Sequence, residues 1–247
     1  MIMRLSIVVP CYNEEPVLQE TTVRLSAVLD SLVEKRKISS DSFILYINDG
    51  SRDMTWTIIE SLHDRNSYVK GLNLAGNVGH QNALMAGLMT AKGYADVLIS
   101  IDADLQDDVS VIEEMVDRYK EGYDIVYGVR SSRDSDTFFK KNTALAFYKL
   151  MSWLGVKSVY NHAGYRLMSR RAVEQLGNYK ERNLFLRGIV PLIGYETTSV
   201  YYRRSERFAG ESKYPLSKMF NFAIDGITSF SVKPLRLIAS LGFLFVL

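Results

Sequence analysis

The sequence predicts one α/β domain whose mostly parallel, Rossmann-like sheet carries helices on both faces. Short β-branched runs alternate along the chain with longer segments of helical apolar spacing. A chain of 247 residues with 47% hydrophobic content is large enough to bury a full core. Polar loops follow several of the apolar runs directly, as in a sheet that binds ligands beyond the carboxyl ends of its strands.

The first elements follow from this pattern. Residues 5–10 form a β-branched run stopped by Pro10, which is typical of a buried parallel strand. A helix begins near Pro16, because apolar residues recur at helical spacing from there to Leu32. Residues 43–47 predict the second strand. A second helix is expected from Met54 to Arg65.

Three more apolar runs complete the predicted sheet. Strands are expected around residues 69–74, over residues 97–101 and over residues 125–128. The loop "AGNVGHQNALMAGL" lies between the first two, and "DADLQDD" begins at the end of the second. Strand and helix therefore alternate throughout this part of the chain.

Charge is segregated along the chain. Residues 1–129 hold 11 Lys and Arg against 20 Asp and Glu, whereas residues 130–247 hold 19 against 8. An acidic half suits a metal site, and a basic half suits phosphate or an anionic membrane surface; the alternative is solvated charge that happens to segregate. The single cysteine, Cys11, fits a reducing compartment, and residues 1–10 have no signal-peptide pattern.

Three polar loops, "CYNEE", "NDGS" and "DADLQDD", each follow a predicted strand directly. We expect them to meet at one edge of the sheet. Asp102 and Asp104 would then need a cation between them, and hard oxygen ligands favour Mg²⁺ or Mn²⁺. The alternative is a solvated acidic turn. We interpret Asp107 and Asp108 as helix N-terminal residues, favoured there by the helix dipole.

Seven segments carry a family resemblance in the same order: "VVPCYNEE", "NDGSRD", "GNVGHQNALMAG", "DADLQDD", "GYRLMSRRA", "LFLRGIVPLIGY" and "RFAGESKYPLSKMFNFAIDGITSFSVKPLR". With them the chain resembles family 2 glycosyltransferases of the GT-A fold. Within that family it is similar to the polyisoprenyl-phosphate glycosyltransferases, which include bactoprenol glucosyltransferases and dolichol-phosphate mannose synthases. The resemblance covers essentially the whole chain.

The resemblance implies a donor site for a nucleotide sugar. The residues that would hold its base and ribose are Pro10, Tyr12, Glu14 and Asp49. The residues that would line the nucleotide or sugar side are Gly79, His80 and Asn82, although "GNVG" also fits a plain strand-to-helix turn. Asp102 would contact the ribose or sugar, and Asp104 with Gln106 would hold the metal. Many relatives have an aspartate where this chain has Asn48.

The acceptor assignment has independent physical support. A phosphate monoester has a second pKa near 6, so it is already a nucleophilic dianion at neutral pH and needs cations and room for its lipid. The cations that we expect to bind it are Arg130, Lys140, Lys141, Arg166, Arg187, Arg207 and Lys213; each alone could equally be a surface cation. Asp102, Asp104 and Arg130 are the catalytic candidates. Relatives often have an acidic residue where Gly164 stands, and His162 is the nearest titratable group, although a lone histidine is more often structural.

The carboxyl end predicts membrane contact. We expect a catalytic domain over residues 1–212, an amphipathic interface helix over residues 213–234, and the start of a truncated transmembrane helix over residues 235–247. Lys233 and Arg236 stand just before the apolar tail, as cytoplasmic-side cations do. The alternatives are ordinary core packing for the amphipathic helix and a short buried terminal helix for the tail.

The expected function is therefore metal-dependent, inverting transfer of a hexose, with glucose favoured, from a UDP-linked sugar to a polyisoprenyl phosphate at the cytoplasmic membrane face. One rival is a family 2 transferase that extends a polysaccharide or teichoic acid. It would need a base near the acceptor hydroxyl, and the processive Q-x-x-R-W signature is absent. The other rival is a non-catalytic nucleotide-binding membrane scaffold. We expect no nucleic-acid partner, and homo-oligomer formation stays open.

Overall fold

A computed structural model of the chain describes residues 2–131, 162–180 and 185–205. These residues fall into two compact units. The first unit holds the sheet and its helices. The second holds residues 185–192, which form the short helices α7 (Leu186–Ile189) and η2 (Val190–Leu192).

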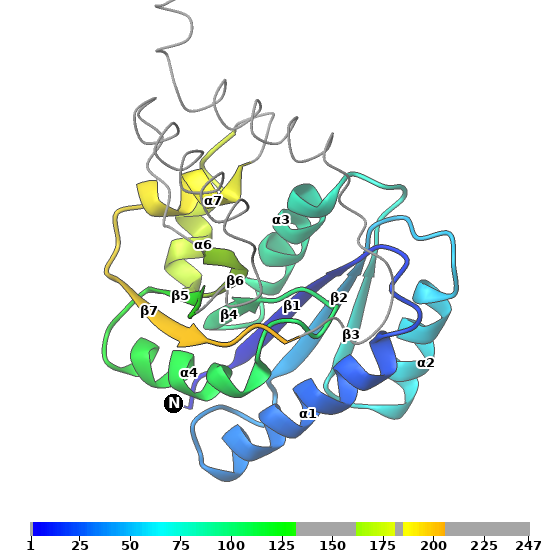
Figure 1. Cartoon of the computed structure of the whole chain (residues 1–247), viewed down its shortest axis with the longest axis horizontal. Coiled ribbons are helices and arrows are strands. Elements are labelled where there is room, and N and C mark those ends of the chain that lie inside the picture. The colour runs from blue at the N-terminus through cyan, green and yellow to red at the C-terminus, as the bar shows by residue number, and fades with distance from the viewer. Residues whose placement is uncertain (1, 132–161, 181–184, 206–247) are drawn as a thin grey trace, which may run out of the picture. The chain divides into compact units, whose positions relative to one another are not determined.

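The first unit is built on a seven-stranded sheet with the order β3-β2-β1-β4-β6-β5-β7 (Figure 1). Its strands are β1 (Leu5–Cys11), β2 (Phe43–Asn48), β3 (Val69–Asn73), β4 (Val97–Ser100), β5 (Ile125–Arg130), β6 (His162–Ser169) and β7 (Thr197–Tyr202). All neighbouring pairs are parallel except the two that involve β6, which runs antiparallel to β4 and β5. The predicted mostly parallel sheet is thus confirmed, with one reversed strand.

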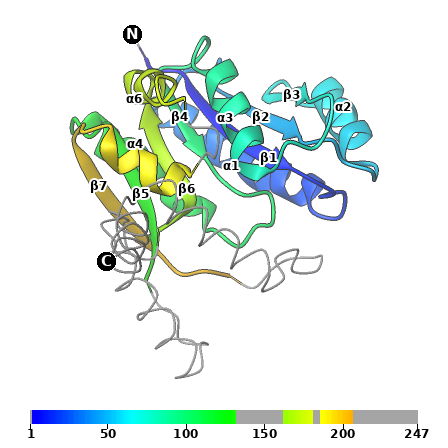
Figure 2. The same cartoon turned by 90° about the horizontal axis from the view of Figure 1, so that it is seen from above.

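Helices cover both faces of this sheet (Figures 1 and 2). One face packs against α1 (Leu18–Glu34), α2 (Thr55–Arg65) and α4 (Ile112–Lys120), the last preceded by the single turn η1 (Val109–Val111). The other face packs against α3 (His80–Ala91), which lies over β1 and β2, and against α6 (Arg170–Leu176). Alternate strand residues point to each face, so both faces of the sheet are apolar and buried.

Helix α3 approaches the sheet very closely at Gly87. A Cβ atom at this position would lie 2.5 Å from Ile47 Cδ1 and 2.7 Å from Val8 Cγ1. Glycine therefore lets the helix lie directly on β1 and β2. Because α3 follows the "GNVG" loop, this contact also fixes the distance between that loop and the sheet.

The predicted elements agree with the structure to within a few residues, with one correction. Pro10 does not stop the first strand, because β1 continues to Cys11 and Pro10 pairs with Ile47 of β2. A proline is tolerated here since β4 pairs with β1 only as far as Val8, so no ladder bond is lost on the β4 side. The expected acceptor cations Lys140 and Lys141, the interface helix and the apolar tail lie outside the described residues. Within those residues, no helix is both long and apolar enough to cross a bilayer.

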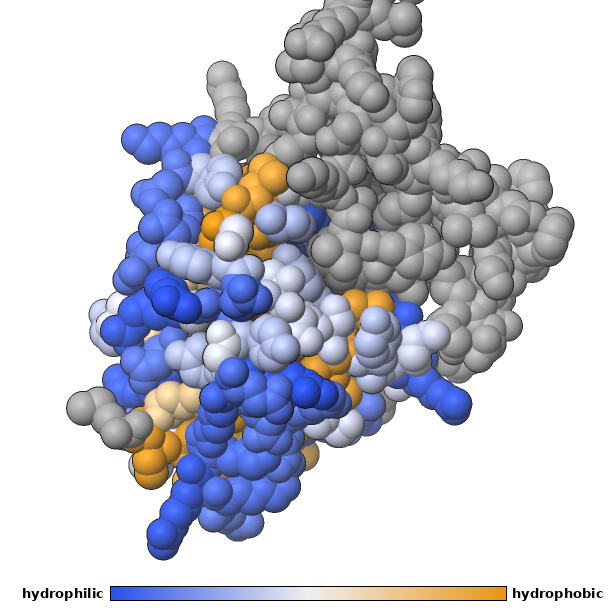
Figure 3. All heavy atoms as spheres, turned by 90° about the vertical axis from the view of Figure 1, so that its left-hand side faces the viewer, coloured by the Kyte–Doolittle hydropathy of each residue, from blue (hydrophilic) through white to orange (hydrophobic). Residues whose placement is uncertain are grey.

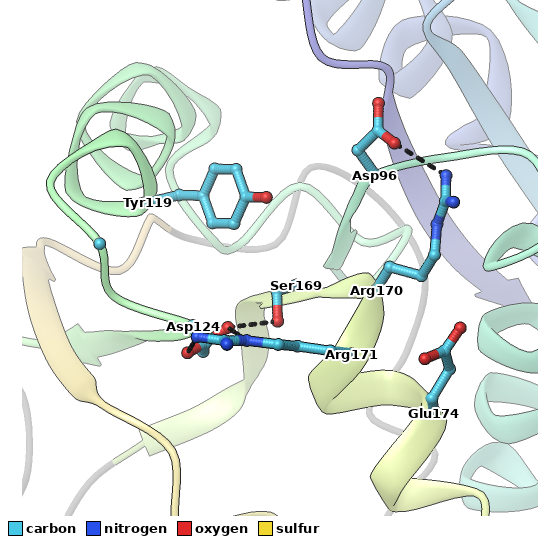
Figure 4. Close-up of a pocket in the computed structure, with 8 residues that line it drawn as sticks. Asp96, Tyr119, Asp124, Ser169, Arg170, Arg171 and Glu174 are labelled. Carbon is cyan, nitrogen blue, oxygen red and sulfur yellow. Dashed lines mark hydrogen bonds and ion pairs between the residues drawn. The ribbon is translucent and has the colours of Figure 1, made fainter.

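The amino-terminal end of the sheet carries a shallow hollow of about 440 Å³ (Figure 4). Four of its charged side chains form two ion pairs. Arg171 donates two hydrogen bonds to Asp124, at 2.6 and 2.5 Å, and Arg170 binds Asp96 at 2.8 Å. Ser169 donates a further bond to Asp124. These pairs tie together the ends of β4, β5 and β6.

The outer edge of the sheet is formed by β7, which is the terminal strand among the described residues. In the view from this side the surface is mostly hydrophilic, with small hydrophobic patches (Figure 3). Tyr201 is one of the exposed large side chains of this strand, whereas its neighbours Val200 and Tyr202 are buried in the core.

Candidate functional site

The loops after β1 and β2 are joined by a set of hydrogen bonds at the carboxyl edge of the sheet. Asn13 donates its backbone N–H to Ser51 Oγ at 3.0 Å, and its side-chain oxygen accepts the N–H of Arg52 at 2.8 Å. Glu14 donates its N–H to Thr55 Oγ1 at 2.9 Å. The predicted convergence of "CYNEE" and "NDGS" is therefore confirmed.

Asp49 binds the loop that precedes α3. Its carboxylate accepts the N–H groups of Val78 at 2.7 Å and Gly79 at 3.1 Å, together with the Asn77 side-chain amide at 3.1 Å. The residue is only 3% exposed. Asp49, which we predicted to contact the nucleoside, thus uses its carboxylate in this structure to hold the "GNVG" loop.

Two glycines make this contact between loops possible. Gly50 has a φ of 62°, and a Cβ there would lie 2.5 Å from the backbone nitrogen of Asn77. Gly79 has a φ of 86° and stands at the N-cap of α3. The alternative interpretation of "GNVG", a strand-to-helix turn with unusual backbone angles, agrees with the backbone at Gly79, and the role of this loop in donor binding stays a prediction.

Asn48 is occupied by neighbouring protein groups. Its amide donates to Asn73 Oδ1 at 2.8 Å, and its side-chain oxygen accepts the N–H of Ser51 at 3.2 Å. Asn48 therefore holds the "NDGS" loop to the end of β3. The amide can make both contacts, which a carboxylate at this position could not, because a carboxylate has no N–H to donate.

The loop after β4 alternates in exposure. Asp102, Asp104 and Gln106 are partly exposed, whereas the residues between and after them, Ala103, Leu105 and Asp107, are buried. The three predicted metal-side and sugar-side groups thus lie on the solvent-accessible side of the loop.

Local contacts hold the loop in this form. The Thr21 hydroxyl of α1 lies 2.8 Å from the carbonyl oxygen of Ala103. Asp104 Oδ1 accepts the N–H of Gln106 at 3.2 Å. Leu105 has a φ of 57°, a left-handed backbone that is unusual for a branched residue. Such strain persists only where the surroundings determine the backbone strongly, so the loop is preorganised.

His80 and Asp102 form a pair across the site. His80 is the first residue of α3, and its Nε2 lies 2.9 Å from Asp102 Oδ1. Gly164 of β6 faces the same carboxylate, since a Cβ at this position would lie 3.9 Å from Asp102 Oδ1. The histidine that borders the aspartate is therefore His80. His162 is the first residue of β6 and lies beside Val129 of β5.

The donor groups of the loop after β4 fit a hard divalent cation that keeps part of its shell for water and substrate. In the described part of the chain, no three His, Cys, Asp or Glu residues gather as a metal-binding group. Mg²⁺ is commonly bound by only one or two carboxylates together with substrate phosphates. The partly exposed Asp102 and Asp104 suit that kind of site, and Gln106 could join them only by releasing the bond that its side-chain oxygen accepts from Arg204.

Asp107 corrects the sequence-based prediction. It is not a helix N-terminal residue but is 4% exposed and faces the ends of two strands. Its Oδ1 accepts a bond from Arg130 Nη2 at 3.1 Å and from the Tyr202 hydroxyl at 2.5 Å. Burial and the nearby charge of Asp102 raise the pKa of Asp107, against the opposing effect of Arg130. Asp108 does cap η1, as predicted, by accepting the N–H of Ser110.

Arg130 lies at the predicted edge, as the last residue of β5. A second arginine near it was missed by sequence reasoning. The Arg204 guanidinium donates to the side-chain oxygen of Gln106, and Ser205 N–H donates to the Gln106 carbonyl at 3.0 Å. Burial and the nearby charge of Arg130 lower the pKa of Arg204. Both arginines therefore border the acidic loop.

The other predicted residues are placed as follows. Tyr12 and Glu14 are partly buried in the first loop, and the Asn82 amide donates to the Val78 carbonyl at 2.8 Å. Arg166 is 2% exposed in β6, and Arg187 lies in α7. The remaining predicted cations, Lys140, Lys141, Arg207 and Lys213, lie outside the described residues. The period-two alternation of "IDADLQD" is the signal that could have placed Asp107 on the buried side.

Comparisons with known proteins identify the family of this chain. The family model described as Glycosyl transferase family 2 matches residues 6–177. The uncharacterized glycosyltransferase YkoT of Bacillus subtilis is 59% identical over 97% of this chain and 71% of its own length. The bactoprenol glucosyl transferase of Shigella phage SfV is 40% identical over 98% of this chain and 79% of its own length.

Solved structures share the fold. The crystal structure of glucosyl-3-phosphoglycerate synthase from Mycobacterium tuberculosis, in complex with Mn²⁺ and UDP-glucose, aligns with a TM-score of 0.54 at 15% identity. The alignment covers 90% of this chain and 76% of that protein. At this identity the likeness speaks for the fold alone. From the family match and the two close relatives, the chain belongs to glycosyl transferase family 2, with the GT-A fold.

Proposed function

We propose that this glycosyltransferase moves a hexose, with glucose favoured, from a UDP-linked sugar to a polyisoprenyl phosphate, and inverts the configuration of the anomeric carbon. The observation that carries the proposal is the placement of two kinds of group at one edge. The acidic loop of Asp102, Asp104 and Gln106 lies beside Arg130, which is bonded to the same loop through Asp107. The bactoprenol glucosyl transferases, at 40% identity over nearly the whole chain, support the same reading.

On the donor side, the loops held together by Asn13 and Asp49 supply the walls for the nucleoside. His80 orients the Asp102 carboxylate toward the ribose or the sugar. Asp104 and Gln106 would hold Mg²⁺ or Mn²⁺, which would neutralise the charge that develops on the departing diphosphate. That chemistry suits this loop, because carboxylate and amide oxygens are ligands of the kind that Mg²⁺ and Mn²⁺ prefer.

On the acceptor side, Arg130 would bind and orient the lipid phosphate. A phosphate dianion needs no general base, so a cation that aligns it with the anomeric carbon is sufficient. Attack from the face opposite the diphosphate inverts the anomeric configuration, and an α-linked donor would give a β-linked product. The arginine beside the acidic loop fits a phosphate acceptor, whereas the hydroxyl acceptor of polysaccharide extension would need a general base.

We further propose that the catalytic domain works at the cytoplasmic membrane face. The support is the sequence pattern of residues 213–247, in which an amphipathic stretch and two cations precede an apolar tail. Ending the chain near Thr228 should leave donor binding intact and reduce transfer to long-chain acceptors far more than transfer to a short soluble analogue. Liposome flotation and the two assays test this, and an equal loss with both acceptors would refute membrane docking.

The function is tested by product analysis. Purified protein with Mn²⁺ and a short polyprenyl phosphate is offered UDP-glucose, UDP-galactose and GDP-mannose separately, and products are resolved by chromatography and NMR. We expect a glucosyl phosphate lipid with a β anomeric signal, and no product when EDTA replaces the metal. Transfer only to a sugar hydroxyl, or a retained α configuration, would contradict the proposal.

A further inference from the structure

Asp107 forms a junction between the acidic loop and the ends of two strands. Arg130 ends β5 and Tyr202 ends β7, and these two residues are direct partners in the parallel ladder. Both donate to the same oxygen of Asp107. Asp107 stands three positions after Asp104, so its carboxylate connects the acidic loop to Arg130 at the end of the neighbouring strand.

The frame around this junction is rigid. The Ser131 N–H and hydroxyl both donate to the Tyr202 carbonyl oxygen, at 2.8 and 3.0 Å. The ring of Tyr202 packs edge-on against Tyr165, with centroids 5.5 Å apart. The Tyr165 hydroxyl in turn donates to the carbonyl oxygen of Asp108 at 3.1 Å. The loop and the ends of β5 and β7 are therefore locked to one another on both sides of Asp107.

Burying the Asp107 carboxylate lowers the stability of the fold. A carboxylate that is almost fully buried loses its hydration, and only good pairing offsets that loss. Here Oδ1 is paired, but the buried Oδ2 accepts no hydrogen bond from any residue in the described part of the chain. An apolar residue at position 107, like Ala103 and Leu105 on the same buried side of the loop, would avoid this cost. Stability alone therefore does not account for an acid at this position.

We infer that Asp107 is a positioning residue, which holds the guanidinium of Arg130 at a fixed place relative to the metal-side groups Asp104 and Gln106. It would thereby set the distance between the acceptor phosphate and the anomeric carbon. This inference rests on the proposed function, because it takes Arg130 to bind a phosphate. It adds a role for a buried residue that touches neither substrate.

The chain contains a matched control for a purely structural role. Asp124 is also a nearly buried carboxylate bound by one arginine, Arg171, and one hydroxyl, Ser169. It lies at the opposite end of the sheet, in the hollow of Figure 4. Asp107→Ala and Asp124→Ala make the same chemical change in similar surroundings. Each removes a buried carboxylate that accepts hydrogen bonds from one arginine and one hydroxyl, so both variants should lose stability.

The experiment measures both variants for melting temperature and for KM of donor and acceptor. We expect Asp107→Ala to raise the acceptor KM about tenfold, through a displaced Arg130, while the donor KM changes by less than about twofold. Asp124→Ala should lower the melting temperature and leave both KM values unchanged. In the double variant Asp107→Ala/Arg130→Ala, the acceptor KM should equal that of Arg130→Ala alone, because both changes remove one interaction.

A binding measurement separates this inference from the proposed function. Calorimetry with a short prenyl phosphate, in the presence of UDP and Mn²⁺, should show binding that Asp107→Ala and Arg130→Ala each weaken, with no further loss in the double variant beyond that of Arg130→Ala. If wild-type protein binds the phosphate in this way but forms no lipid-linked sugar, the proposed function fails and the inference stands. If Asp107→Ala lowers only the melting temperature, as Asp124→Ala does, or if wild-type protein binds no phosphate, the inference is overturned.

Discussion

Replacing Asp49 by asparagine should loosen the loop that precedes α3. The Asp49 carboxylate accepts three hydrogen bonds, from Val78 N–H, Gly79 N–H and the Asn77 amide. An asparagine keeps one oxygen for Val78 but presents N–H₂ to the other two donors. The substitution therefore breaks two bonds to a charged acceptor in a buried place.

The magnitude follows from those two bonds. Hydrogen bonds to charged groups contribute about 1.5–3 kcal/mol each and are not fully additive, so we expect the free energy of unfolding to fall by roughly 2–4 kcal/mol. For a chain of 247 residues this corresponds to a melting temperature lower by roughly 5–15 °C. Because His80 follows the loop directly and pairs with Asp102, affinity for the donor should also fall.

The assay is thermal unfolding with Asp53→Asn as the control. Asp53 belongs to the same loop but is partly exposed, and its two oxygens accept the N–H of Thr55 at 3.0 Å and the N–H of Glu15 at 3.3 Å. Asparagine keeps the bond from Thr55 and loses only the longer bond at the surface, so the control should change stability by less than about 1 kcal/mol. Equal melting temperatures for Asp49→Asn and wild type would refute the assigned role of the Asp49 carboxylate.

Two further predictions concern packing and pH. Gly128→Ala would place a Cβ 2.8 Å from the buried ring of Tyr165, so the free energy of unfolding in urea should fall by about 1–3 kcal/mol. In the control Gly164→Ala the new Cβ would lie 3.9 Å from its nearest neighbour, so the free energy of unfolding should fall far less. Burial raises the pKa of Asp124, but bonds from Arg171 and other groups outweigh it, so the pKa lies below its ordinary value. The ionised Asp124 carboxylate contributes its full stabilisation above the unfolded-state pKa, and this contribution is lost as the pH falls through the folded-state pKa. Between pH 6 and about pH 3, the free energy of unfolding should therefore fall less in Asp124→Asn than in wild type.

Much of the fold and of the donor edge can be predicted from the sequence, because the signals there are local. The β-branched runs that become β1, β2 and β4 are bounded by polar loops, and parallel strands bring those loops to one edge whatever the details. The reversed direction of β6 has no such signal. A run of alternating residues looks the same in either direction, and only pairing with β4 and β5 sets it.

Asp107 and Arg204 show where local reasoning fails. Asp107 is an aspartate directly before a true helix cap, Asp108, so its residue type and position suggest the same role. Its actual partners, Arg130 and Tyr202, are 23 and 95 residues away in sequence, and the sheet brings them together. Arg204 lies in a run of charges and reaches Gln106 from 98 residues away. Contacts between residues so far apart in the sequence depend on tertiary structure, which hydrophobic periodicity and secondary-structure propensity do not predict.

The central claim, that the loop after β4 holds a metal ion against a nucleotide-sugar donor, is tested most directly by calorimetric titration of UDP-glucose with and without Mn²⁺. The variant is Asp104→Ala, and the control is Asp108→Asn in the same loop, where asparagine preserves the cap on Ser110. We predict Mn²⁺-dependent binding in wild type and in Asp108→Asn, and its loss in Asp104→Ala with an unchanged far-ultraviolet spectrum. Unchanged Mn²⁺-dependent binding in Asp104→Ala would contradict the claim.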